Sequence, residues 1–360
     1  MFLKWKVLAL ALPAAFMVAC REQPSAPQAT DVAVLPGASA SLHAAPTYTI
    51  KDLGTLGGAN SSAQAINGDG WVVGVSDVVQ AGATHAFLWK DGRMMDLGTL
   101  GGTSSKAIGV NDAGEIVGSS QVAGDAAWHA FRWSHGRMMD LGGLGGSYAE
   151  GFDINHAGDV AGGSVTADNV SFHAVLWRHG RIRDLGALGG TYSFSNGISN
   201  SDVVVGGATV AGGDQHAFLW RDGVMHDIGT LGGTDAYATH INGAGTVVGS
   251  SATPGNVAMH PFLWHHGRMS DLGDLGGGYS IAQWINDEGQ VVGGSALANG
   301  GQHAVLWDHG AMTDLGILPG GANYTWAQAI NDRGRVVGVA YTATYEGHAV
   351  LWATRDHDHR

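Results

Sequence analysis

The residues with the clearest capacity for chemistry are histidines and aspartates that recur at fixed spacing. A His-x-x-x-Trp motif occurs seven times, and an Asp-Leu-Gly motif, once in the form Asp-Ile-Gly, stands at seven evenly spaced positions. Imidazole and carboxylate groups bind metal ions and exchange protons, so these sets could supply a metal centre or an acid–base site. The histidines are His85, His129, His173, His216, His260, His303 and His348. The aspartates are Asp52, Asp96, Asp140, Asp184, Asp227, Asp271 and Asp314.

The spacing of these motifs favours a structural role. Successive Asp-Leu-Gly motifs begin 43 or 44 residues apart. A constant period in this range is typical of repeats that stack or form a ring. Equivalent positions of such repeats lie well apart unless they face a central channel, whereas zinc ligands sit within about 2.3 Å of the metal. We therefore interpret each His, Asp and Trp as holding its own repeat together, and we predict no metal site and no cofactor.

Other motifs that could carry chemistry are weak. The Gly-Gly pairs that follow Leu56, Leu100 and their equivalents lack the lysine of a phosphate-binding loop. The Asn-x-x-Gly turns lack the alternating carboxylates of calcium loops. Glu150, Asp153 and His240 are ionisable residues that occur in single repeats. No catalytic residue is predicted, although a site assembled from different repeats stays open.

Each repeat contains the pattern of four short strands. In the repeat over residues 84–120, Asp91-Gly92 is a strong hairpin signal, and the Asn-Asp-Ala-Gly of 111–114 is a second tight turn. No apolar period of 3.6 residues is present, which argues against helices. Strands are expected at 85–89, 93–97, 106–110 and 115–119, with a loop over 98–105. We predict an all-β fold, a seven-bladed β-propeller of four-stranded repeats over residues 47–352.

The two ends of the repeat region complement each other. The first repeat strand, Tyr48 to Leu53, has no His-x-x-x-Trp strand before it. The last one, His348 to Trp352, has no return strand after it. We predict that the two pair and close the ring, which removes exposed sheet edges.

Three motifs recur in fixed order over essentially all of residues 47–352. They are His-Ala-Phe-Leu-Trp, Asp-Leu-Gly-Thr-Leu-Gly-Gly and Ala-Ile-Asn-x-x-Gly-x-Val-Val-Gly, first complete at 85–89, 52–58 and 65–74. In these motifs the chain resembles the HAF-repeat family of extracellular repeat proteins. The departures are Val175, Val305 and Val350 for Phe, Pro261 for Ala, and Ser199 for Asn. The resemblance implies an exported repeat protein and brings no defined activity with it.

The N-terminal residues are expected to direct export. Residues 1–20 have a short basic start and an apolar run over 7–18 that is too short to span a membrane comfortably. The run ends at Cys20, the only cysteine, and Phe-Met-Val-Ala-Cys resembles a bacterial lipobox. The resemblance implies a lipid on Cys20, which we favour over an ordinary signal peptide cut further along. Arg21 after the cysteine implies an outer-membrane lipoprotein of a Gram-negative bacterium.

The composition and charge of the chain limit the kinds of molecule that it can bind. Residues 21–46 are rich in Ala, Pro, Ser and Gln and are expected to form a flexible linker, and 353–360 a disordered tail. The net charge of −13, without a basic run, disfavours nucleic acid as a partner. With one cysteine there is no disulfide, so packing alone must stabilise the fold. We expect a monomer that meets the membrane only through its lipid anchor.

Aromatic residues after the Leu-Gly-Gly motifs are the candidate binding residues. Antiparallel strands place these segments on the same face as the variable loops before each repeat histidine. Rings there could stack on a glycan or hold a protein partner, or they could cap the core. A binding or scaffold module is favoured over a glycan-processing lyase or hydrolase in the central channel, and a purely structural envelope protein stays open. The candidates are Tyr148, Tyr192, Phe194, Tyr237, Tyr279, Tyr324 and Trp326.

Overall fold

The computed structural model describes residues 48–354, which belong to one compact unit. The predicted secretory signal with Cys20, the predicted linker and residues 355–360 lie outside this range. The described chain is all-β and propeller-like, with 28 strands and two short 3-10 turns, η1 (Ala123–Asp125) and η2 (Pro254–Asn256). No helix in residues 48–354 has the length and apolar character needed to cross a membrane.

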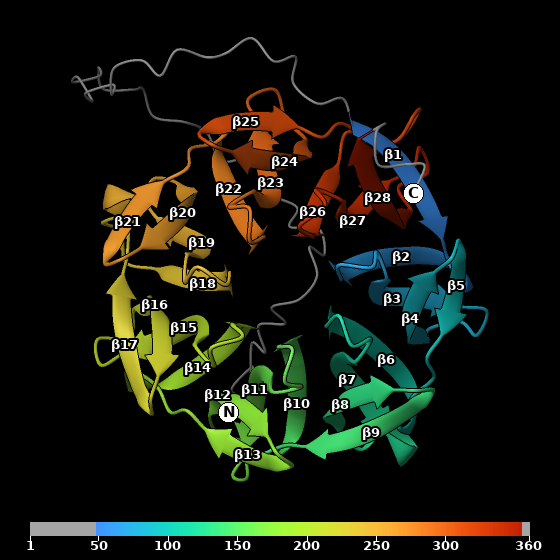
Figure 1. Cartoon of the computed structure of the whole chain (residues 1–360), viewed down its shortest axis with the longest axis horizontal. Helices are drawn as coiled ribbons and strands as arrows, with labels where there is room; N and C mark the ends of the chain where they lie inside the picture. Colours follow the sequence, from blue (N-terminus) through green and yellow to red (C-terminus); the bar gives the residue numbers. More distant parts are fainter. Residues whose placement is uncertain (1–47, 355–360) are drawn as a thin grey trace, which may run out of the picture. The chain divides into compact units, whose positions relative to one another are not determined.

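Antiparallel pairing joins the strands into sets of four, which are arranged around a common centre in Figure 1. We call the strand nearest that centre the inner strand and the strand farthest from it the outer strand. From inner to outer, the first set consists of β2 (Gly57–Ile66), β3 (Val72–Val78), β4 (Thr84–Lys90) and β5 (Arg93–Asp96). The second consists of β6 (Gly101–Val110), β7 (Ile116–Val122), β8 (Trp128–Ser134) and β9 (Arg137–Gly142). The third consists of β10 (Gly145–Ile154), β11 (Val160–Thr166), β12 (Phe172–Arg178) and β13 (Arg181–Asp184). The next are β14 (Gly189–Ile198), β15 (Val204–Val210), β16 (Gln215–Arg221) and β17 (Val224–Gly229); then β18 (Ala236–Ile241), β19 (Val247–Ala252), β20 (Met259–His265) and β21 (Arg268–Asp271). The last are β22 (Gly276–Ile285), β23 (Val291–Leu297), β24 (Gln302–Asp308) and β25 (Ala311–Asp314); then β26 (Thr325–Ile330), β27 (Val336–Tyr341), β28 (Gly347–Thr354) and β1 (Tyr48–Gly54).

The final set joins the two ends of the described chain. Strand β28 pairs with β1 in an antiparallel register that runs from Tyr48 opposite Thr354 to Gly54 opposite Ala349. The pairing that the sequence predicted between the first and last repeat strands is therefore present. Strand β28 continues two residues beyond Trp352, so Ala353 and Thr354 belong to the sheet and not to a tail.

Local sequence explains the tight hairpins between the last two strands of the first six sets. In the β4–β5 hairpin both turn residues have a positive φ, 50° at Asp91 and 76° at Gly92. Two consecutive residues with positive φ form the turn that matches the twist of a hairpin, and Asp-Gly or His-Gly at this point tolerates it.

The Val-Gly step of the second strand is a packing requirement. A Cβ on Gly74 would lie 2.0 Å from the carbonyl oxygen of Ser62 on the inner strand, and each equivalent glycine meets a carbonyl at 1.9 to 2.1 Å. Only glycine permits this approach of two backbones. The repeated glycines therefore keep the inner and second strands of every set in close contact.

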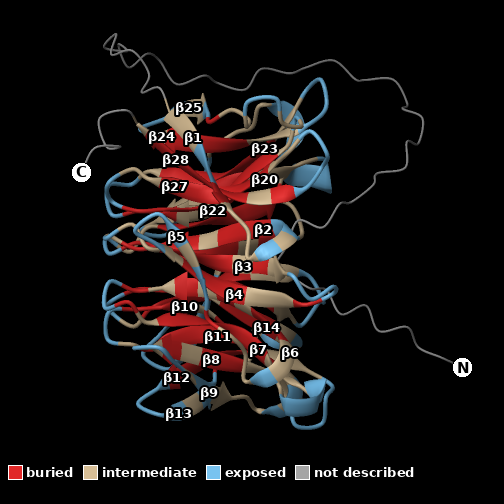
Figure 2. Ribbon diagram, turned by 90° about the vertical axis from the view of Figure 1, so that its right-hand side faces the viewer, coloured by how far each residue is buried: buried red, intermediate tan, exposed pale blue. Residues whose placement is uncertain are grey.

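The hydrophobic core lies between neighbouring sets. One cluster combines Ala65 and Val73 of the first set with Ile116 and Phe131 of the next, all of them buried. Figure 2 shows the strands as mostly buried and the connections at the two edges as exposed. A single set cannot cover its own apolar faces, so each depends on its neighbours.

Five inner strands, β2, β6, β10, β14 and β22, are longer than the sequence suggested. Strand β6 begins at Gly101, so most of the loop expected over 98–105 is strand. In five sets a serine of the second strand accepts a hydrogen bond from the leucine N–H of Leu-Gly-Gly, as Ser120 Oγ does from Leu100 at 2.8 Å. In the five inner strands that begin early, a bulge such as the register shift between Gly101 and Ser105 separates the first paired residue from the rest of the pairing.

Candidate functional site

The repeated histidines and aspartates pair within their strand sets. In six sets the histidine Nδ1 lies 2.7 to 2.9 Å from a carboxylate oxygen of the aspartate 11 residues later. His348 pairs with Asp52 at 2.7 Å in the set that joins the chain ends. The aspartate also accepts the N–H of the glycine two residues on, as Asp96 does from Gly98 at 2.7 Å. The hydrogen bonding of the repeated His and Asp within one set, as the sequence predicted, is therefore present. Within residues 48–354, no group of three or more His, Cys, Asp or Glu residues could hold a metal ion.

The Asn-x-x-Gly turns form a chain of hydrogen bonds around the centre. Each asparagine donates from Nδ2 to the backbone carbonyl of the equivalent turn residue in the next set. The donor–acceptor pairs are Asn67–Asn111 (3.2 Å), Asn111–Asn155 (3.0 Å), Asn155–Ser199 (3.4 Å), Asn242–Asn286 (3.1 Å), Asn286–Asn331 (3.1 Å) and Asn331–Asn67 (3.0 Å). Ser199 breaks the chain, because its hydroxyl bonds locally to Ser201 and to the Val203 N–H.

Completing this chain should stabilise the protein. In Ser199→Asn the new amide can donate to the Asn242 carbonyl while its oxygen still accepts the Val203 N–H, as the other turn asparagines do. We expect the free energy of unfolding to rise by about 1 kcal/mol, the net value of one hydrogen bond. The mirror variant Asn331→Ser should lower it by a similar amount. Urea denaturation of both variants tests this, and a Ser199→Asn protein no more stable than the parent contradicts it.

A cavity of about 170 Å³ lies at the centre, lined by these turns and by the ends of the inner strands. The polarity of this cavity depends on the residue two positions before the turn asparagine of each set, or before Ser199 in the fourth set. Four sets have small residues there, Ala65, Gly109, Gly197 and Ala329. The other three have Asp153, His240 and Trp284, which line the cavity together. The repeat is therefore broken on one side of the centre by an acid, a base and an aromatic ring.

These three residues, which we call the central triad, contact one another from β10, β18 and β22. His240 Nε2 lies 3.6 Å from Asp153 Oδ2. The imidazole stacks on the Trp284 indole, with ring centres 3.6 Å apart and planes 19° from parallel. Asp153 accepts the N–H groups of Ile154 and Ile198, both at 2.8 Å, and His240 Nδ1 lies 3.1 Å from the carbonyl oxygen of Ile285.

Burial shifts the titration of both ionisable members of the central triad. Asp153 is 5% exposed and His240 is 8% exposed. Desolvation raises the pKa of Asp153 to about 6, against two backbone hydrogen bonds that lower it. Desolvation also lowers the pKa of His240 to about 3. The cavity thus contains an acid next to a base, and burial disfavours the charged form of each.

The predicted aromatic residues lie on strands rather than in loops. Only Tyr324 precedes its strand; the others are on β10, β14, β18, β22 and β26. The early start of the inner strands explains the difference. Phe194 and Trp326 are 2% and 4% exposed and pack in the interior, whereas Tyr279 is 45% exposed. Tyr148, Tyr192, Tyr237 and Tyr324 are partly buried.

Several of these rings form a continuous row, which we call the aromatic row. It includes Trp128 and Phe172, which directly precede repeat histidines and were not among the predicted residues. A parallel pairing of strand starts, Phe172 opposite Tyr192, brings the two groups together. The centroid distances are 6.4 Å for Trp128–Tyr148, 6.3 Å for Tyr148–Phe172, 5.6 Å for Phe172–Tyr192, 5.9 Å for Tyr192–Phe194 and 6.4 Å for Phe194–Tyr237.

A buried ion pair lies under the aromatic row. Lys106 Nζ is 2.6 Å from Glu150 Oε1, and Tyr148 donates its hydroxyl to Glu150 Oε2 at 2.6 Å. Ser119 also donates its hydroxyl to Glu150 Oε1, at 3.1 Å. Because Glu150 is 2% exposed and fully partnered, it serves to hold Tyr148 and two strand sets together.

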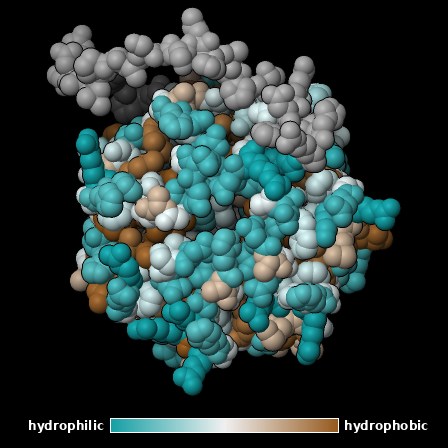
Figure 3. Space-filling view, viewed as in Figure 1, coloured by the Kyte–Doolittle hydropathy of each residue, from teal (hydrophilic) through white to brown (hydrophobic). Residues whose placement is uncertain are grey.

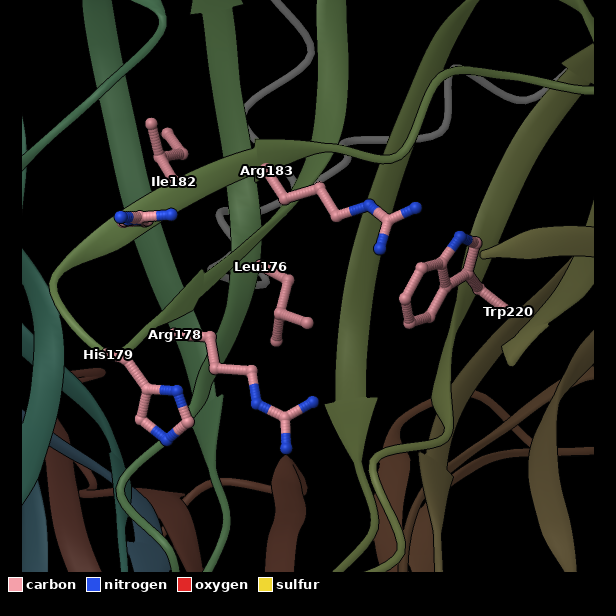
Figure 4. Close-up of a pocket in the computed structure, with 7 residues that line it drawn as sticks. Leu176, Arg178, His179, Ile182, Arg183 and Trp220 are labelled. Atoms are coloured by element: carbon pink, nitrogen blue, oxygen red, sulfur yellow. The ribbon is translucent and has the colours of Figure 1, made fainter. Parts of the chain in front are cut away.

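A groove of about 480 Å³ lies between the β12–β13 hairpin and Trp220 (Figure 4). Arg178 and Arg183 both reach into it. Arg178 already pairs with Asp159 at 3.0 Å and Asp202 at 2.8 Å, and the Arg183 guanidinium lies 4.9 Å from the centre of the Trp220 ring. These contacts link two neighbouring sets, so the arginines act as cross-links at this rim.

On the face drawn in Figure 3, hydrophilic residues predominate and hydrophobic ones form small separate patches.

Sequence reasoning singled out Asp153 and His240 as residues that occur once, but it did not bring them together and it missed Trp284. Aligning the repeats on the turn asparagine would have found all three, because they occupy one position that is otherwise Gly or Ala. Their proximity depends on which sets are neighbours and on how far each side chain reaches across the centre.

Comparison with known proteins supports the fold alone. No protein-family model matches the chain, and no curated protein matches it. Among solved structures, the β-propeller domain of the Trilobed protease from Pyrococcus furiosus is similar with a TM-score of 0.57 at 13% identity, over 81% of this chain and 92% of that one. A puromycin-hydrolyzing peptidase from Mycobacterium tuberculosis gives 0.53 at 13% identity, and an acylaminoacyl peptidase from Pyrococcus horikoshii 0.51 at 12%, covering 82% and 81% of this chain. The chain spans about half the length of these two peptidases, 51% in each case. The fold is thus a propeller-like scaffold.

Proposed function

We propose that this protein is an exported binding or scaffold module, a closed seven-bladed propeller that holds a glycan or a protein partner at its aromatic row. The HAF-like motifs, the lipobox-like Cys20 and Arg21 support an outer-membrane lipoprotein of a Gram-negative bacterium. In that arrangement residues 21–46 tether the repeat region to the membrane. The proposal rests on the sequence for the anchor and on the aromatic row for the function.

The continuous row of rings is the observation that carries the function. Fixed strands need similar residues in every repeat, but Trp128, Phe172 and the tyrosines occur only in some of them. Adjacent rings with restrained orientations offer apolar faces and edges at little entropic cost, which suits stacking on sugar rings or gripping a protein surface. Phe194 supports the row from the interior, and Tyr279 adds an exposed ring.

Replacing rings on the surface should separate binding from stability. We expect Tyr192→Ala/Tyr279→Ala to lower affinity for the ligand by at least ten-fold and to move the melting temperature by only a few degrees. Phe194→Ala is the matched control, because it removes a buried ring from the same row and should lower the melting temperature by several degrees or more. A glycan array and a pull-down from envelope extracts identify the ligand. If the double variant loses as much stability as Phe194→Ala and keeps all binding, the rings are core caps.

A second candidate function, catalysis on a glycan at the centre, is favoured by one observation. The central triad combines an acid and a base with shifted pKa values in a cavity. Lyase or hydrolase activity would depend on Asp153 or His240. The loss of such activity in Asp153→Asn, with binding at the aromatic row retained, would distinguish it from the first function.

A further inference from the structure

We propose that the central triad is a binding site for a small primary amine, whose ammonium group Asp153 and His240 hold between them. This site is separate from the aromatic row, and the inference does not depend on the function proposed for that row. Four lines of reasoning support it: the break in the repeat, the roles of the ring nitrogens, the spacing of the two acceptors and the charge of the cavity.

The fold does not need the central triad. At the same strand position the other sets have Ala65, Gly109, Gly197 or Ala329, and their strands pair in the same register. Three polar or aromatic side chains at an otherwise small position bury an acid and a base, which opposes folding unless another group compensates. Residues that oppose stability and depart from a repeat are where a function resides.

The hydrogen bonds fix what each atom can still do. His240 Nδ1 faces a backbone carbonyl, so it is the nitrogen that carries the proton, and the neutral ring presents the lone pair of Nε2. Asp153 already accepts two backbone N–H groups, and its Oδ2 faces Nε2. The ionised carboxylate and the neutral imidazole therefore point two acceptors at each other.

The spacing suits one donor group between the acceptors. At 3.6 Å the Nε2 and Oδ2 atoms are too far apart for a direct hydrogen bond. A nitrogen placed on the cavity side can lie about 2.9 Å from both and give one N–H to each. A catalytic metal would need a third protein ligand. In the described chain no third His, Cys, Asp or Glu is placed to provide one.

The charge of the cavity favours a cation. The described residues that line it include Asp112, Asp153, Asp287 and Asp332, and no lysine or arginine. His156 on the rim is already paired with Asp112, with its Nε2 atom 3.1 Å from Asp112 Oδ2. Trp284 stacks on His240 and fixes the plane of the imidazole. A cavity of about 170 Å³ restricts the ligand to a small amine.

The test uses NMR on the full soluble repeat region with the His240 ring labelled. We expect n-butylammonium chloride to shift the His240 Cε1–Hε1 signal in a saturable manner at pH 7.5. Neither n-butanol, which has the same chain without charge, nor tetramethylammonium, which has charge without N–H groups, should do so. Asp153→Asn should weaken n-butylammonium binding at least ten-fold, and Tyr192→Ala on the aromatic row should leave it unchanged.

Several outcomes overturn the proposal. They are no shift with n-butylammonium, an equal shift with n-butanol, or unchanged binding in Asp153→Asn. If Asp153→Asn does not fold, Asp153→Ala recreates the residue that two other sets use and takes its place. Loss of glycan or protein binding in the aromatic-row variants, with amine binding intact, shows that the two sites fail independently.

Discussion

Replacing Asp153 or His240 alone should make stability strongly pH-dependent, whereas the parent protein should show little dependence from this pair. In the folded protein the pKa of Asp153 is raised from 3.8 to about 6, and that of His240 is lowered from 6.5 to about 3. Between about pH 4 and 6 the folded state holds a proton on Asp153 that the unfolded chain has released, so Asp153 makes stability rise as pH falls. Over the same range the unfolded chain holds a proton on His240 that the folded state lacks, so His240 makes stability fall as pH falls.

These two effects cancel only while both residues are present. Asp153→Asn leaves the histidine effect, and its free energy of unfolding should fall by about 3 kcal/mol as the pH falls from 6.5 to 4. His240→Ala leaves the aspartate effect, and its free energy of unfolding should rise by about 2 kcal/mol between pH 6 and 4. Urea denaturation at closely spaced pH values measures both differences.

The double variant Asp153→Asn/His240→Ala is the control and should follow the parent curve in shape. A constant offset between the variant and parent curves of unfolding free energy against pH reflects lost packing and leaves the pH dependence unchanged. If the single variants run parallel to the parent over pH 4 to 6.5, the two groups titrate as they do in the unfolded chain, and the pKa shifts that burial gives them are refuted.

Trp352→Ala should cost about 3–5 kcal/mol of stability, the usual loss for a fully buried aromatic ring. Trp352 is 0% exposed and packs in a cluster with residues of β26, β27 and the neighbouring set. It lies on the strand that joins the two ends of the described chain, so its loss weakens both the core and the β1–β28 pairing. The midpoint of chemical denaturation measures the effect.

Two comparisons make this result specific. The Trp352 Nε1 group is buried without a hydrogen-bond partner among the described residues, so Trp352→Phe gives up no hydrogen bond and should cost less than half as much. Trp89 occupies the same repeat position but is only partly buried, with Lys51 above its ring, and Trp89→Ala should also cost less. Equal losses in Trp89→Ala and Trp352→Ala would show that burial does not set the contribution of this motif.

The sequence by itself determined the all-β class, the order of strands in each repeat and the pairing of β1 with β28. These follow from local chemistry and from counting, because Asp-Gly and Asn-x-x-Gly specify turns and a strand without a partner must find one. It also indicated that the repeated His and Asp residues act within their own repeats, since a motif present in every repeat at equal spacing is typical of a structural role. The extent of the inner strands was not determined in this way, because a bulge in the pairing with the second strand, which the Leu-Gly-Gly segment does not reveal, accompanies the early start of five of them.

Tertiary structure alone decided what lies at the centre and which rings touch. Asp153, His240 and Trp284 come from three repeats, and only the arrangement of the sets brings their side chains within 3.6 Å. The aromatic row likewise depends on strand starts that pair across sets, which joins Phe172 to Tyr192 and leaves Trp326 in the interior. Periodicity fixes the position of each residue along its strand, whereas contacts between repeats depend on how neighbouring sets pack, and that is a property of the assembled fold.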